Sequence, residues 1–129
     1  MPLTRFRGET ELDLCAKNEN PTSLMAIPEM TPQEVNSQLS KLRLIDVRRP
    51  EEFTGELGHI KGAQLVTLET DFEASLGSLS KDAVYVFVCR SGMRSGKATA
   101  MAQAAGLNQV FNMSGGMIAW NEAGLPVEK

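Results

Sequence analysis

Residues suited to chemistry lie together in one short run: Cys89, Arg90, Ser91, Gly92, Met93, Arg94 and Ser95. The run follows an apolar segment, 83–88, that predicts a buried strand, and it leads into a predicted helix over 93–105. At such a junction, unpaired backbone N–H groups and the positive end of the helix dipole lower the pKa of a thiol. Gly92 allows the backbone to curve so that successive N–H groups point inward and bind an anion. We therefore predict that Cys89 is a catalytic nucleophile and that residues 90–95 bind its substrate.

The side chains around this cysteine suit an anionic substrate. Arg90 and Arg94 add positive charge that would attract an anion. Ser91 and Ser95 offer hydroxyl donors, and Met93 lies where it would touch the substrate. The alternative is that the cysteine is a small buried hydrophobe and that the arginines form a solvated basic turn. The residues alone leave both interpretations open, although the arginines and the glycine favour a nucleophile.

Four polar residues earlier in the chain are candidates for supporting the loop: Asp46, Arg48, Glu52 and His59. Asp46 ends a predicted strand, and we expect it to accept hydrogen bonds from the backbone or from Arg48 rather than to act as a base. We expect an ion pair between Arg48 and Glu52 that fixes the corner between this strand and the next helix. His59 lies in a glycine-rich turn, so we predict a structural role for it rather than that of a base for Cys89.

The composition excludes several classes of protein. With 129 residues, of which 42% are hydrophobic and 22% charged, the chain fits one globular domain and not a disordered segment. A net charge of −3 argues against a nucleic-acid partner. Two cysteines and one histidine cannot build a disulfide framework and make a poor zinc site. The second cysteine, Cys15, would be either a resolving thiol for Cys89 or an incidental thiol, and we favour the latter.

The chain divides at its first regular segment. Residues 1–23 have weak periodicity and are interpreted as an N-terminal extension, either flexible or with a short helix over 11–17; residues 24–129 form the predicted domain. No segment has the features of a targeting signal or of a membrane span. We therefore expect a cytoplasmic protein with no membrane partner, monomeric by default.

Strands and helices alternate along the domain, which predicts an α/β fold with a central parallel sheet of about five strands flanked by helices. Strands are predicted over 24–27, 43–47, 63–66, 83–88 and 109–112. Between them, helices are predicted after Thr31, from Pro50, over 71–76 and over 93–105, and a last helix opens at Gly115. Sites in such folds form beyond the carboxyl ends of the strands, which is where Cys89 lies.

Four segments resemble, in order, the motifs of single-domain rhodaneses, a family of sulfurtransferases. They are Leu44–Arg48 with Glu52 and Phe53, Gly58–Ala63, Cys89–Ser95 and Gly115–Trp120. Together they span most of 44–120, and four motifs in this order are highly specific, although the resemblance does not reach residues 1–23. It implies a rhodanese-like three-layer sandwich.

The resemblance also implies sulfur transfer through a persulfide on Cys89. A small anionic donor such as thiosulfate would leave a sulfane sulfur on the cysteine, and cyanide or a thiol would remove it, so no metal or organic cofactor is needed. Phosphatase chemistry is the nearest rival, but the loop from Cys89 to Arg94 is one residue shorter than the loop of cysteine phosphatases. A sulfur carrier or recognition module that acts on a partner protein is the other alternative.

Overall fold

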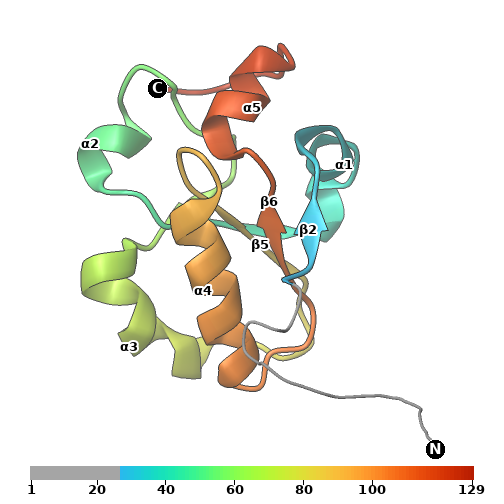
Figure 1. Ribbon diagram of the computed structural model, residues 1–129, viewed down its shortest axis with the longest axis vertical. Helices are drawn as coiled ribbons and strands as arrows, with labels where there is room; N and C mark the ends of the chain where they lie inside the picture. The colour runs from blue at the N-terminus through green and yellow to red at the C-terminus, as the bar shows by residue number, and fades with distance from the viewer. Residues whose placement is uncertain (1–26) are drawn as a thin grey trace, which may run out of the picture.

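Five short strands form the centre of the protein in the order β2-β6-β5-β3-β4, and every neighbouring pair is parallel. The computed structural model describes residues 27–129 (Figure 1). The strands are β2 (Glu29–Met30), β3 (Arg43–Asp46), β4 (Gln64–Leu65), β5 (Tyr85–Val88) and β6 (Val110–Met113). The predicted parallel sheet of about five strands is confirmed.

Helices and short helical turns connect the strands. They are α1 (Pro32–Ser37), η2 (Leu39–Lys41), α2 (Pro50–Phe53), η3 (Leu68–Phe72), α3 (Glu73–Ser75), η4 (Leu76–Ser78), α4 (Met93–Ala104) and α5 (Gly116–Glu122). The Thr31 side chain accepts a hydrogen bond from the Glu34 N–H at 3.1 Å, and the Glu34 carboxylate accepts one from the Thr31 N–H at 2.9 Å. This reciprocal capping fixes the start of α1, as the sequence predicted.

The sheet separates two apolar cores. Side chains of β5 alternate between its faces, so that Phe87 packs beneath α4 with Ala98, whereas Val86 packs on the other face with Trp120 of α5. Helices α3 and α4 lie beside each other in Figure 1, and α1 contacts α5. Cys89 continues the alternation and belongs to the core on the α4 side. Cys89 therefore lies in the short loop between the end of β5 and the start of α4.

Two elements of the structure lie outside the predicted ranges. The predicted strand over 24–27 lies outside the described residues except for Ile27, which is not in a strand. The strand beside β6 is Glu29–Met30, which the sequence did not predict. This edge strand is two residues long and buries one side chain, Met30, so it leaves little apolar pattern in the sequence. The helix predicted over 71–76 begins earlier, at Leu68, and continues as three successive turns to Ser78.

The predicted extension over 1–23, with Cys15, lies outside the described residues. Along residues 27–129, none of the helices combines the length and the apolar character needed to cross a membrane.

Candidate active site

Cys89 is buried yet surrounded by hydrogen-bond donors. It directly follows β5 and is 1% exposed. The Gly92 N–H donates to Sγ at 3.0 Å, and the Ser95 hydroxyl oxygen lies 3.3 Å from Sγ. A cysteine that only fills space needs no such donors, whereas donors aimed at a sulfur stabilise its anionic form. The burial expected of a packing cysteine is therefore present together with the polar surroundings expected of a nucleophile.

The start of α5 holds the loop in this shape. The Met117 N–H donates to the Cys89 carbonyl oxygen at 2.8 Å. The Ile118 N–H donates to the Arg90 carbonyl oxygen at 3.0 Å. Because a trans peptide points its N–H opposite to its C=O, the next two N–H groups of the loop turn away from α5. A Cβ atom on Gly116 would lie 2.5 Å from both carbonyl oxygens, so glycine is required for this close approach.

Gly92 makes the turn from the loop into α4. Its φ of 101° lies in the left-handed region, which favours glycine, and its N–H points at the sulfur. Its carbonyl oxygen accepts a hydrogen bond from Asn112 Nδ2 at 3.1 Å. The 12-residue helix α4 begins at the next residue, Met93, so its N-terminal dipole end lies at the sulfur.

The hydrogen bonds at the sulfur lower its pKa. Burial raises the pKa of the Cys89 thiol, but the Ser95 hydroxyl and the backbone N–H groups of Ser95, Gly92 and Ser91 together lower it by more. The resulting pKa is below the ordinary value for cysteine. A larger fraction of Cys89 is therefore thiolate near neutral pH than for a free cysteine.

Arg94 is paired with a carboxylate. Its Nη1 and Nη2 donate to Oε1 and Oε2 of Glu52, each at 2.8 Å. These hydrogen bonds lower the pKa of Glu52 to about 2 and raise the pKa of Arg94. The predicted ion pair between Glu52 and Arg48 is wrong, because Arg48 binds Asp46 instead. Glu52 thus ties α2 to the first turn of α4, and the charge of Arg94 is largely neutralised.

Arg48 and Asp46 form a second, fully buried pair. Arg48 Nε donates to Asp46 Oδ1 at 2.8 Å, and Nη2 donates to Oδ2 at 2.7 Å. Each side chain is 1% exposed. Arg48 Nη2 also donates to the Gly58 carbonyl oxygen at 2.8 Å, which joins the end of β3 to the following turn. Asp46 therefore supports the carboxyl end of β3 rather than contacting the sulfur.

His59 and Trp120 bind segments other than the loop. His59 Nδ1 lies 2.9 Å from the Phe53 carbonyl oxygen, and the two rings stack with their centroids 3.8 Å apart. The backbone of His59 pairs with that of Glu128. Trp120 is fully buried and donates from Nε1 to the Pro126 carbonyl oxygen at 2.8 Å. Both residues thus fasten the C-terminal segment to the domain.

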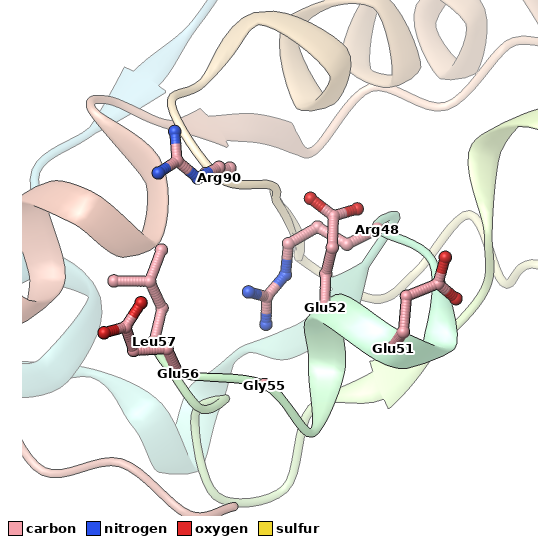
Figure 2. Close-up of a pocket in the computed structure, with 7 residues that line it drawn as sticks. All are labelled: Arg48, Glu51, Glu52, Gly55, Glu56, Leu57 and Arg90. Carbon is pink, nitrogen blue, oxygen red and sulfur yellow. The ribbon is translucent and has the colours of Figure 1, made fainter.

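The outer rim of the loop is exposed. Arg90, Ser91 and Met93 reach the surface, and Met93 is 81% exposed, more than any other large hydrophobic residue in the described part of the chain. Arg90 lines a pocket of about 240 Å³ and lies across it from Arg48 and Glu52 (Figure 2). Within residues 27–129, no carboxylate forms an ion pair with Arg90. Arg90 is therefore the loop arginine whose charge faces solvent.

Sequence reasoning missed Asn112. This residue of β6 is 4% exposed and lies behind the loop, where its Oδ1 accepts a hydrogen bond from the Ser95 hydroxyl. Its Nδ2 donates to the Gly92 carbonyl oxygen and to Glu29 Oε2, each at 3.1 Å. The available signal was an amide within the otherwise apolar run of β6.

The described residues place a thiol and hydrogen-bond donors at the site. Along residues 27–129, no three side chains of His, Cys, Asp or Glu gather in a way that could hold a metal ion.

The sequence matches the family model for the rhodanese-like domain over residues 31–123. The chain belongs to this family. A solved structure of a rhodanese-like domain protein from Staphylococcus aureus has a TM-score of 0.68 and 31% identity, and the match covers 80% of this chain and all of that one. The rhodanese-like fold predicted from the motifs is confirmed.

Relatives of this rhodanese-like chain include proteins named as sulfurtransferases. The putative sulfurtransferase YtwF of Bacillus subtilis is 41% identical over 80 residues, which cover 62% of this chain and 74% of YtwF. The probable adenylyltransferase/sulfurtransferase MoeZ of Mycobacterium tuberculosis is 37% identical over 95 residues, which cover 70% of this chain. The chain spans about a quarter of the length of MoeZ. The family to which the chain belongs therefore includes proteins named as sulfurtransferases.

Proposed function

We propose that this rhodanese-like chain transfers a sulfane sulfur from an anionic donor such as thiosulfate to cyanide or a thiol, through a persulfide on Cys89. The observation that carries the proposal is the set of donors on Sγ, with the Gly92 N–H at 3.0 Å and the Ser95 hydroxyl at 3.3 Å. They lower the pKa of the thiol in spite of its burial. The cysteine sulfur carries the transferred atom, so the proposal includes no cofactor.

In the first step, the Cys89 thiolate attacks the terminal sulfur of thiosulfate. A bond forms between Sγ and this sulfur, the sulfur–sulfur bond of thiosulfate breaks, and its electron pair leaves with sulfite. The negative charge passes from Sγ to the outer sulfur of the persulfide. Backbone N–H groups at the start of α4 would stabilise this charge, since they are fixed in place before the reaction.

The two loop arginines have different roles in this proposal. Arg90 is exposed and unpaired within the described residues, so it would attract the anionic donor. Arg94 is held by Glu52, and we assign it to fixing the loop rather than to binding the donor. This differs from the sequence-based prediction, in which both arginines attract the donor.

In the second step, an acceptor removes the outer sulfur. Cyanide attacks that sulfur, the bond to Sγ breaks, and its electron pair remains on Cys89 as the thiolate. Thiocyanate is the product, and the enzyme returns to its starting state. The donors around Sγ would stabilise the charge that returns to it.

Thiocyanate production from thiosulfate and cyanide tests the proposal. We expect the wild-type chain to form thiocyanate, the Cys89→Ser variant to form none above the uncatalysed rate, and a Cys15→Ser variant to keep the wild-type rate. The Cys15 variant is the matched control, because it removes the other thiol of the chain. Wild-type activity no higher than that of Cys89→Ser would contradict the proposal for this donor.

A carrier that passes its sulfur to a partner protein is the second candidate function. The exposure of Met93 on the rim of the loop favours it, because a large apolar side chain at 81% exposure suits contact with another protein. Met93→Ser should then slow persulfide transfer to a reduced test protein with one exposed thiol more than it slows transfer to cyanide. An equal effect on both acceptors would contradict the carrier function.

A further inference from the structure

The Ser95 hydroxyl lies between two acceptors but has one proton to donate. One acceptor is Cys89 Sγ at 3.3 Å, and the other is Asn112 Oδ1. Ser95 is fully buried, so water does not provide a third partner. Its backbone carbonyl accepts a hydrogen bond from the Thr99 hydroxyl at 2.8 Å, which adds to the fixed position of this helical turn. The hydroxyl hydrogen can therefore turn from one acceptor to the other while the heavy atoms stay in place.

The amide of Asn112 is oriented by its other partners. Nδ2 faces the carbonyl oxygen of Gly92 and a carboxylate oxygen of Glu29, each at 3.1 Å. Both of these groups only accept hydrogen bonds, so the NH₂ group must point to them. Oδ1 must then point to Ser95, where it acts as an acceptor. The competition for the Ser95 proton is thus built into the hydrogen-bond network.

We propose that Asn112 is a positioning residue that acts through Ser95: its Oδ1 accepts the hydrogen bond of the Ser95 hydroxyl when Sγ of Cys89 is neutral, and the hydroxyl turns away from it to Sγ when Sγ becomes negative. A neutral sulfur is a weak acceptor, so the amide oxygen is then the better partner. An anionic sulfur is the stronger acceptor, so the hydroxyl then turns to it. The buried hydroxyl keeps a hydrogen bond in both charge states.

This inference rests on the proposed function, because each step of sulfur transfer moves charge at Sγ. When the persulfide forms, Sγ becomes neutral and the Ser95 proton turns to Asn112. When an acceptor removes the outer sulfur, Sγ leaves as a thiolate and the proton turns back to it. The hydroxyl thus follows the charge through both steps without any transfer of a proton to solvent.

The pKa of the Cys89 thiol reports this competition without any sulfur donor. With a neutral Cys89, Oδ1 accepts the hydrogen bond of the Ser95 hydroxyl, so removing Oδ1 destabilises the protonated thiol. With an anionic Cys89, Oδ1 is left without this hydrogen bond, so removing it relieves a cost of the thiolate state. Both effects lower the pKa of Cys89. We expect the part of the change that passes through Ser95 to lower the pKa by about 0.5 to 1, which corresponds to one hydrogen bond. Charged groups near the sulfur include Arg94, its partner Glu52, and Glu29 beyond the amide, and the exposed Arg90 directly follows Cys89 in the chain.

A double-mutant cycle isolates the part of the pKa change that depends on the Ser95 hydroxyl. Asn112→Ala is made with Ser95 present and in a Ser95→Ala background, both in a Cys15→Ser chain so that Cys89 is the one remaining thiol. The pKa is measured from the rate of alkylation by iodoacetamide as a function of pH. The charged neighbours are the same in all four proteins. Any loosening of the loop through the lost bond to Gly92 occurs in both backgrounds and cancels.

We expect Asn112→Ala to lower the Cys89 pKa more with Ser95 present than in the Ser95→Ala background, by about 0.5 to 1. The same change in both backgrounds, or an upward change that depends on Ser95, would overturn the inference. If Asn112→Ala does not fold, Asn112→Leu fills the space and completes the same cycle. Alkylation of Cys89 needs no persulfide. If the Ser95-dependent change of the Cys89 pKa is found in a chain that forms no thiocyanate, the proposed function is contradicted and the hydrogen-bond competition is not.

Discussion

Replacing Glu52 by glutamine should destabilise the protein in a pH-dependent manner. The Arg94 guanidinium lowers the pKa of Glu52 from 4.5 to about 2. Without weakening by solvent, this difference in pKa corresponds to about 3 kcal/mol of folding stability. Because the two side chains are 30% and 29% exposed, water weakens the pair, and we expect about 1 kcal/mol. Since the pKa is lowered on folding, this stability is present above pH 4.5 and is lost as the pH falls toward 2.

Urea denaturation at pH 7 and at successively lower pH values measures the effect. Glu51→Gln is the matched control, because it removes the same charge from the same first turn of α2 at an exposed position. We expect Glu52→Gln to be less stable than Glu51→Gln by about 1 kcal/mol at pH 7, and the difference to close as the pH approaches 2. Equal stability of the two variants at pH 7, or a difference that does not change with pH, would refute the reasoning.

Three further variants test other parts of the site. Arg90→Glu should raise the KM for thiosulfate several-fold more than the KM for a neutral organic trisulfide, because it reverses an exposed charge, and equal losses would argue against steering. Gly116→Ala should lower the free energy of unfolding, measured by urea denaturation, by about 2 kcal/mol more than Gly124→Ala does. Both glycines have positive φ, but a Cβ atom would lie 2.5 Å from two carbonyl oxygens at Gly116 and within 4 Å of nothing at Gly124. Similar losses of stability in the two variants would therefore contradict the close approach of α5 to the loop. Asp46→Asn should lower the free energy of unfolding by about 3 to 5 kcal/mol, because it leaves the buried Arg48 without its counter-ion. A loss of stability no larger than that of Asp82→Asn, at an exposed position, would contradict this expectation.

The position of the candidate nucleophile, Cys89, was predictable because its determinants are local in the chain. The apolar strand, Cys89, Gly92 and the following helix are consecutive, and each favours its conformation without help from distant residues. The capping of α1 by Thr31 was predictable for the same reason. The two-residue edge strand β2 was not predicted, since its position depends on pairing with β6, more than 80 residues away.

The hydrogen bonds that Asp46 was expected to accept from Arg48 are present, but the other partners of the charged and polar residues were not predictable, because several partners were available to each. Arg48 has a carboxylate two residues before it and another four residues after it, and only the burial of Asp46 at the end of β3 decides between them. Glu52 and Arg94 are 42 residues apart and meet because α2 and α4 flank the same loop. Asn112 could be recognised as a buried amide only once β6 was seen to lie behind Ser95.

The intact mass of the protein after incubation with thiosulfate tests the central claim most directly, since it asks whether Cys89 holds the sulfur. We predict that the wild-type chain and the Cys15→Ser variant each gain the mass of one sulfur atom, that cyanide returns the mass to its original value, and that Cys89→Ser gains nothing. A wild-type chain that takes up no sulfur, or a Cys89→Ser chain that takes up as much as the wild type, would contradict the account.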